Sequence, residues 1–138
     1  MKTLVFCIAA VLAAGCAGED PYQARNVTTM QPGYGVVLAT FKYVPGESKF
    51  APSQVASDAR YAADRLALLG YQSFFVYDGS YAAKVGVRAS SMSLAQALKK
   101  DFERRGSIKL GDGNSIPVAN VEITNIAELK LKASDMKP

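Results

Sequence analysis

The chain contains no histidine, no tryptophan and only two cysteines among its 138 residues. Histidine is the commonest general base and the commonest metal ligand, so its absence excludes the usual hydrolytic triads and the usual zinc sites. The carboxylates of Asp64, Asp78 and Glu122 have no partner at a catalytic spacing in the sequence. We therefore predict a protein without enzymatic activity, metal or cofactor.

Strong charge of one sign is also missing. The chain has 16 Lys and Arg residues against 12 Asp and Glu residues, which gives a formal net charge of +4. A nucleic-acid-binding domain needs a dense basic stripe, so this mild excess predicts no nucleic-acid partner. A small positive balance suits a domain beside a membrane or wall surface that carries anionic groups.

The amino terminus is poor in charge and rich in apolar residues. Lys2 is the only charged residue before Cys16, residues 3–12 are almost wholly apolar, and the run ends as Leu12-Ala13-Ala14-Gly15-Cys16. An apolar stretch of this length is too short for a mature transmembrane helix, which needs about 20 residues. The pattern therefore predicts a signal peptide and an exported protein.

The run that ends at Cys16 resembles the lipobox of bacterial lipoprotein precursors. This resemblance implies removal of residues 1–15 and attachment of lipid to Cys16, which would anchor the protein to a membrane. Cys7 would leave with the signal, so the exported domain keeps no thiol for a disulfide, a metal or a nucleophile. Ala17 follows the cysteine where Asp would retain a lipoprotein at the inner membrane, so the resemblance favours the periplasmic face of the outer membrane. An ordinary secretory signal is the alternative.

The rest of the chain divides into three parts. Residues 16–33 mix Gly, Asp, Gln, Asn, Thr and Pro without a sustained period, which predicts a lipidated tether. Residues 34–126 carry regular apolar patterns and are long enough to bury one core. Residues 127–138 form a C-terminal tail for which the sequence predicts no definite structure.

Strand patterns occur at the start, in the middle and near the end of the predicted domain. Residues 35–41, 71–77 and 80–87 are β-branched, apolar or aromatic runs, and the pair Asp78-Gly79 predicts a hairpin between the last two. Residues 108–123 predict a second hairpin, whose second arm completes the sheet.

Two helical patterns separate these strands. Apolar residues recur at three- and four-residue steps over residues 53–69, and Gly70 is the expected stop. The second helix covers residues 93–105, where Ser93 and Gln96 have the spacing of a capping box. Its predicted apolar face consists of Leu94, Ala97, Leu98 and Phe102.

The order of these elements is βαββαβ, with an extra hairpin before the last strand. This order predicts an α+β fold, in which a four-stranded antiparallel sheet carries both helices on one face in a ferredoxin-like arrangement. The opposite face of the sheet is then bare, and a bare face is available for binding.

Several segments resemble the sporulation-related repeat, or SPOR, domain. They are Tyr34-Gly35-Val36-Val37-Leu38-Ala39-Thr40-Phe41, Ala63-Asp64-Arg65-Leu66, Ser80-Tyr81-Ala82-Ala83-Lys84-Val85-Gly86-Val87 and the helix over residues 94–102. The resemblance covers residues 34–105. It implies a βαββαβ module that binds peptidoglycan glycan strands from which the stem peptides have been removed. Val37 stands where the family usually has Gln, and Ala82 stands where a basic residue is common.

Candidate glycan contacts follow from the alternation of side chains along the strands. If Phe75 faces the helices, Phe74 faces the bare side and can stack a sugar ring. Gln72 can bond hydroxyl groups, and Lys84 can reach a carboxylate such as a muramic lactyl group. The full set of predicted contacts is Val37, Ala39, Gln72, Phe74, Ala82, Lys84 and Gly86.

Other interpretations stay open. Phe74 can instead pack beneath the C-terminal tail, and Lys84 can be a solvated residue of the sheet. The leading prediction is a lipid-anchored module that recognises peptidoglycan glycan through the bare sheet face. The second is a structural or adaptor lipoprotein that binds another envelope protein and no glycan.

Overall fold

The computed structural model describes residues 23–44, 46, 52–79, 82–118 and 120–133. The predicted signal peptide, Cys16, the first part of the predicted tether and the last five residues of the chain lie outside this set. Within the described residues, no helix is both long and apolar enough to cross a membrane.

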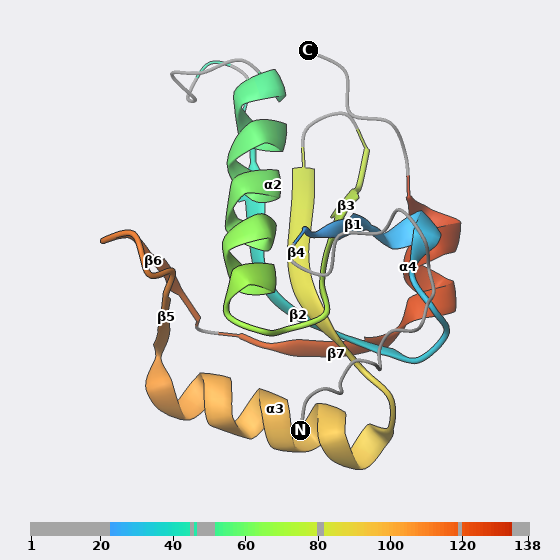
Figure 1. Cartoon of the computed structure of the whole chain (residues 1–138). Coiled ribbons are helices and arrows are strands. Elements are labelled where there is room, and N and C mark those ends of the chain that lie inside the picture. The colour runs from blue at the N-terminus through green and yellow to red at the C-terminus, as the bar shows by residue number, and fades with distance from the viewer. Residues whose placement is uncertain (1–22, 45, 47–51, 80–81, 119, 134–138) are drawn as a thin grey trace, which may run out of the picture.

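A five-stranded sheet forms the centre of the molecule (Figure 1). Its strands are β1 (Arg25–Asn26), β2 (Tyr34–Lys42), β3 (Ser73–Tyr77), β4 (Ala82–Ala89) and β7 (Glu122–Asn125), in the order β1-β3-β4-β2-β7. The last four strands of this order pair antiparallel, whereas β1 pairs parallel with β3. The α+β class is therefore confirmed, but the prediction of a four-stranded sheet is wrong.

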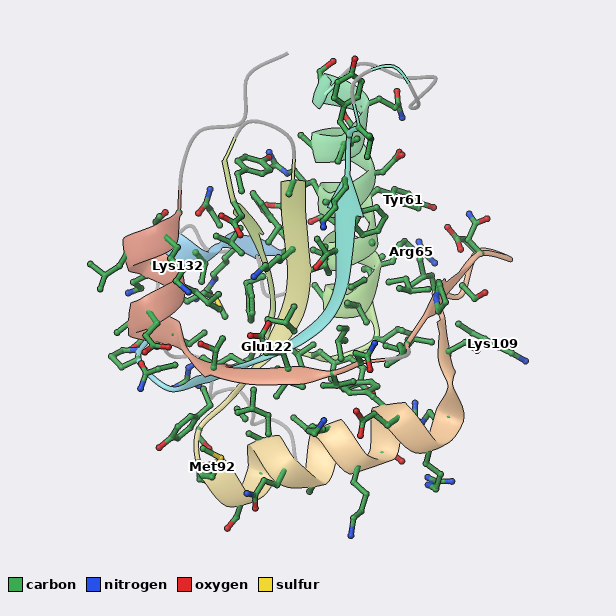
Figure 2. The ribbon with its side chains drawn as sticks, turned by 180° about the vertical axis from the view of Figure 1, so that it is seen from behind. Tyr61, Arg65, Met92, Lys109, Glu122 and Lys132 are labelled. Carbon is green, nitrogen blue, oxygen red and sulfur yellow. The ribbon has the colours of Figure 1, made fainter. Side chains whose placement is uncertain are left out.

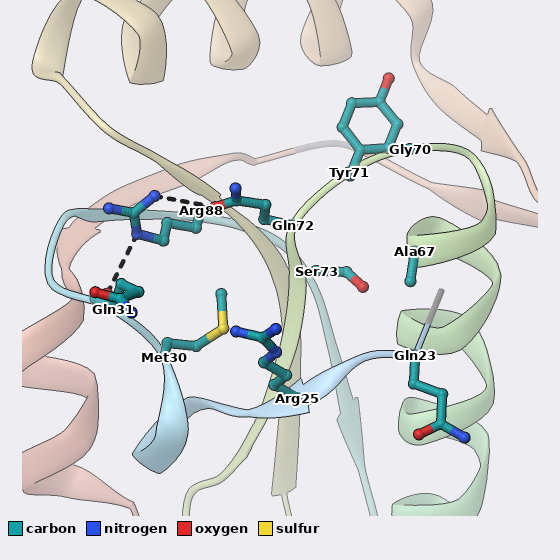
Figure 3. Close-up of a pocket in the computed structure, with 10 residues that line it drawn as sticks. All are labelled: Gln23, Arg25, Met30, Gln31, Ala67, Gly70, Tyr71, Gln72, Ser73 and Arg88. Carbon is teal, nitrogen blue, oxygen red and sulfur yellow. Dashed lines mark hydrogen bonds between the residues drawn. The ribbon is translucent and has the colours of Figure 1, made fainter. Parts of the chain in front are cut away.

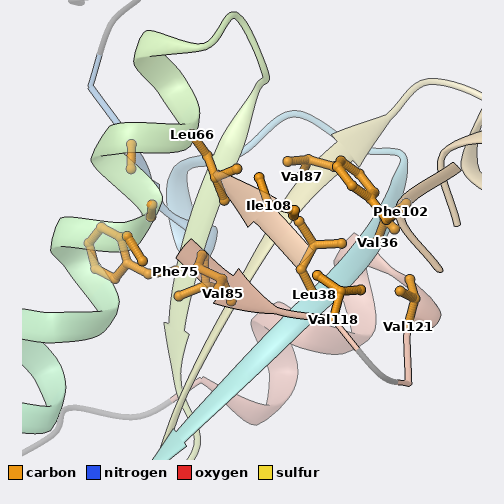
Figure 4. Close-up of a cluster of buried hydrophobic side chains, with 14 of the residues drawn as sticks. Val36, Leu38, Leu66, Phe75, Val85, Val87, Phe102, Ile108, Val118 and Val121 are labelled. Atoms are coloured by element: carbon orange, nitrogen blue, oxygen red, sulfur yellow. The ribbon is translucent and has the colours of Figure 1, made fainter. Parts of the chain in front are cut away.

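Two long helices cover one face of the sheet. Helix α2 (Pro52–Leu68) turns its small residues inward, and Ala59, Ala62 and Ala63 are buried together with Leu66. Helix α3 (Met92–Arg105) buries Ala95 and Phe102 in the same core, whereas Leu94 is exposed. Figure 4 shows how Val36, Leu38, Val85 and Val87 of the sheet meet Leu66 and Phe102 in this first core.

The other face of the sheet is covered, which corrects the prediction of a bare face. A 3-10 helix, η2 (Val27–Thr29), and a third helix, α4 (Ile126–Lys132), pack there, and Figure 1 shows α4 on the side of the sheet opposite α2. The second core consists of Val27, Met30, Val37, Phe74, Val76, Ile126 and Leu129. The sequence pattern missed this layer because both covering segments are short, and neither has a long apolar period.

Residues 24–30 therefore belong to the folded domain. Ala24, Val27 and Met30 are buried, and the backbone N–H of Ala24 donates a hydrogen bond to Oδ1 of Asp64 at 2.9 Å. Asn26 caps η2 by accepting a hydrogen bond from the Thr28 backbone N–H at 3.1 Å. The prediction of a tether over residues 16–33 is thus wrong for this part, because buried apolar residues hold it against the sheet.

The second predicted hairpin forms a small sheet of its own. Strands β5 (Ser107–Lys109) and β6 (Ser115–Pro117) pair with each other, and only β7 joins the main sheet, beside β2. Ile108 and Ile116 of the hairpin are buried in the first core. The Arg65 side chain of α2 donates a hydrogen bond to the Leu110 carbonyl at 2.9 Å, and Figure 2 shows Tyr61 and Arg65 on the side of α2 next to this hairpin.

Candidate functional site

The predicted glycan platform is the centre of the second core. Phe74 is 0% exposed, and Val37 and Gly86 are also buried. A Cβ atom on Gly86 would lie 2.4 Å from the Val36 carbonyl oxygen and 2.8 Å from Phe74 Cζ. The space beside Gly86 is therefore filled by the protein itself, and the prediction that these residues face solvent is wrong. The alternative, that Phe74 packs beneath the C-terminal segment, is confirmed.

The remaining predicted contacts do not gather into one surface. The register of β2 against β4 shifts between Val37 and Ala39, so this β-bulge turns Ala39 toward the first core. Lys84 pairs with Asp78 at 3.7 Å, and its side chain is mostly buried. Ala82 is half-buried, whereas Gln72 is exposed at the start of β3. Of the predicted set, Gln72 is the residue that lines a pocket.

A pocket of about 390 Å³ lies between the N-terminal segment, the end of α2 and the start of β3 (Figure 3). Its lining combines polar and charged side chains with apolar surface, which includes the buried residues Met30 and Ala67. They are Gln23, Arg25, Met30, Gln31, Ala67, Gly70, Tyr71, Gln72, Ser73 and Arg88. Sequence patterns contain only weak signs of this site, since half of these residues fall in the predicted tether or in turns.

Arg88 shapes one wall of the pocket. Its Nε atom lies 2.9 Å from the Pro32 carbonyl oxygen and 3.2 Å from that of Gln31, and its Nη1 donates to Gln72 Oε1 at 2.9 Å (Figure 3). The Arg88 backbone N–H also donates to the Gln72 carbonyl at 2.8 Å. These bonds join the loop before β2 to the start of β3, so the polar groups of the wall are fixed before any ligand arrives.

Ser73 and the end of α2 shape the opposite wall. The buried Ser73 hydroxyl donates to the Ala63 carbonyl at 2.6 Å, which attaches β3 to α2. Gly70 adopts a positive φ of 102° and ends the helix, as the sequence predicts. The chain then turns at once into Tyr71 and Gln72, and this sharp turn brings both residues to the lining of the pocket.

The lining has the chemistry of a site for an anionic, hydroxyl-rich ligand. The guanidinium groups of Arg25 and Arg88 bring positive charge that suits carboxylate or phosphate oxygens. Arg88 already donates from Nε, Nη1 and Nη2 to groups of the protein, and one N–H of each Nη atom is left for a ligand. Three glutamine amides can donate to and accept from hydroxyl and acetamido groups. None of the described residues that line the pocket is acidic.

Several carboxylates of the described residues make structural contacts outside the pocket. Tyr61 donates a hydrogen bond to Asp112, and together with the Asn114 backbone N–H this bond lowers the pKa of Asp112 to about 2. The same bond raises the pKa of Tyr61. Hydrogen bonds from Lys99 and from the Val121 backbone lower the pKa of Glu103. Across the described ranges, no group of three or more His, Cys, Asp and Glu residues is placed to hold a metal ion.

Comparisons with known proteins add no relative: no family model, no curated protein and no solved structure matches the chain. The function is therefore proposed from the chemistry of the pocket and from the sequence.

Proposed function

We propose that the chain is a lipid-anchored envelope protein that binds an anionic glycan without transforming it. The pocket lined by Arg25, Arg88 and three glutamines is the proposed site, in place of the sheet face. The observation that supports the site is that cationic and amide side chains line one pocket, with no acidic residue among the described lining. Peptidoglycan glycan has the matching chemistry, because its sugars carry hydroxyls, acetamido groups and, once the stem peptide is removed, a lactyl carboxylate. The resemblance to the SPOR domain supports the same ligand class.

The proposed anchor at Cys16 places this site close to a membrane. Six residues, 17–22, separate Cys16 from Gln23, the first residue of the pocket lining. At 3.3–3.6 Å per residue, the extended chain spans at most about 25 Å. The lipid and the pocket therefore limit the ligand to the zone next to the membrane, which suits a protein that holds cell-wall glycan near its bilayer.

Sedimentation with purified peptidoglycan sacculi tests the proposal. The full-length protein in detergent should be retained by amidase-treated sacculi, which carry exposed lactyl carboxylates, more than by untreated sacculi. Gln31→Glu places a negative charge in the exposed pocket wall and should weaken retention, whereas Gln96→Glu makes the same change outside the pocket on α3. No retention of the parent protein, or equal retention of the two variants, would contradict the proposal.

An adaptor lipoprotein is the second candidate. The observation that favours it is that α4 fills the sheet face and presents Leu131, which is 87% exposed, between Lys130 and Lys132. An adaptor should copurify with a stable envelope protein, lose it on Leu131→Asp and keep it on Gln31→Glu. If the protein shows this pattern and is not retained by sacculi, protein binding becomes the supported function and glycan binding is contradicted.

A further inference from the structure

A second pocket lies next to the end of α2 and shares one lining residue with the first. It has a volume of about 500 Å³ and is lined by Leu69, Tyr71, Arg105, Ser107, Ile108 and Lys109. Tyr71 belongs to the lining of both pockets, so the two pockets meet at this residue. The Tyr71 ring packs on Phe102 of α3 with ring centroids 5.5 Å apart, which fixes the position of the ring.

The second pocket is also cationic. Lys109 is exposed on β5, and the Arg105 guanidinium lies 5.9 Å from the centroid of the Phe102 ring. Arg105 pairs with Asp101 at 2.7 Å, whereas Lys109 has no carboxylate partner among the described residues. As in the first pocket, the described lining includes no acidic residue. Each of the two pockets that share Tyr71 is thus lined by two cationic side chains.

We infer that the ligand is an acidic polysaccharide long enough to occupy both pockets across Tyr71. This inference rests on the proposed function, since it extends the same site. A single sugar acid would use the charges of only one pocket, whereas a strand with a carboxylate on each repeating unit can reach Arg25 and Arg88 at one end and Lys109 at the other. The apolar face of a sugar ring can pack on the tyrosine between them. Two weak subsites joined by one ligand raise the affinity through effective concentration.

Length-fractionated glycan provides the test. Amidase-released peptidoglycan strands are separated into single disaccharides and long strands, and their binding to the full-length protein in detergent is measured by calorimetry. Long strands should bind at least about tenfold more tightly than single disaccharides at the same disaccharide concentration. Lys109→Glu should weaken long-strand binding about two- to fivefold, the range of an exposed ion pair, and leave disaccharide binding unchanged.

Matched variants separate the two pockets. Lys100→Glu makes the same charge change on the exposed surface of α3, outside both linings, and should bind like the parent protein. Gln31→Glu should weaken binding of both ligand lengths, because it alters the first pocket. Equal affinity for both lengths, with no effect of Lys109→Glu, would overturn the second subsite and leave the proposed function standing.

Two further outcomes are decisive. If neither ligand length binds, the proposed function itself fails. If poly-glutamate of matched charge binds as tightly as the long strands, the recognition is of charge alone, and the inference of a polysaccharide ligand is overturned.

Discussion

Phe74 is the residue on which the second core depends. It is fully buried among Val37, Val76, Ile126 and Leu129, so its removal leaves a large cavity beneath α4. Phe74→Ala should lower the free energy of unfolding by about 3–5 kcal/mol, as phenylalanine truncations in cores do. Urea unfolding followed by circular dichroism measures this change. Phe74→Leu should cost less, and a loss below about 1 kcal/mol for Phe74→Ala would show that α4 does not cover this ring.

Asp112 makes the stability depend on pH. Its pKa in the folded protein is about 2, against an ordinary value of 3.8, because Tyr61 and the Asn114 backbone donate to its carboxylate. A carboxyl group with a lowered pKa stabilises the fold above its unfolded pKa, and this contribution disappears as the pH falls from about 4 to about 2. The stability of Asp112→Asn should therefore decline less over this range than that of the parent protein. Parallel curves of unfolding free energy against pH would contradict this expectation.

At the level of single elements, α4 offers two leucines with opposite roles. Leu129 is 4% exposed in the second core, whereas Leu131 is 87% exposed two residues later. Leu129→Ala should cost about 2–5 kcal/mol, and Leu131→Ala should stay within about 0.5 kcal/mol of the parent protein. Chemical denaturation of both variants compares them directly. Similar effects from the two substitutions would mean that α4 is not packed as the structure describes.

At the start of α3, the sequence pattern predicts the helix cap to within two residues of its observed position. The pattern of Ser93 and Gln96 predicts a cap at Ser93, but the helix begins at Met92 and Ser91 is the cap. Its hydroxyl oxygen accepts a hydrogen bond from the Leu94 backbone N–H at 3.2 Å. The run Ser90-Ser91-Met92-Ser93 offers three serines as possible caps. Propensity alone therefore leaves the first residue of the helix ambiguous within about two positions.

This difference can be measured. Ser91→Ala should destabilise the protein by about 1 kcal/mol, the usual loss for an N-cap side chain. Ser93→Ala should lack this loss, because Ser93 already lies inside the helix. Thermal or urea unfolding compares the two variants, and a greater loss for Ser93→Ala would restore the predicted cap.

Alternation within strands was predictable because it depends on local geometry. The sequence places Phe75 on the helix side and Phe74 on the opposite side, and the two cores contain them in that way. The bulge at Leu38 was not predictable, since its residues read as a regular strand, and it reverses the side to which Ala39 turns. The pocket was missed for a related reason: Arg25 and Arg88 are distant in sequence, and their meeting depends on the parallel pairing of β1 with β3.

For the molecule as a whole, the layer that covers the second sheet face excludes this face as a binding surface. Two helices against one sheet face were predictable from long apolar periods, whereas the second layer depends on Val27, Met30, Ile126 and Leu129 at the two ends of the domain. Short segments carry too few apolar residues to show a period, and their burial depends on tertiary contacts. This second layer moves the proposed binding site from the sheet face to its edge.

Shortened chains test whether the N-terminal segment belongs to the layer that covers the second sheet face. A chain that begins at residue 34 keeps the predicted domain but loses Val27 and Met30, which are 0% and 4% exposed, and it loses the N-terminal wall of the pocket. It should be less stable than a chain that begins at residue 17 by at least about 3 kcal/mol, because two buried apolar side chains contribute about 1.5–3 kcal/mol each. Urea unfolding measures the difference, and a chain that begins at residue 23 is the control, since it keeps every N-terminal residue that the structure describes. Equal stability of all three chains would mean that residues 24–30 are a tether after all, and the pocket would then lack a fixed wall on which to hold a glycan.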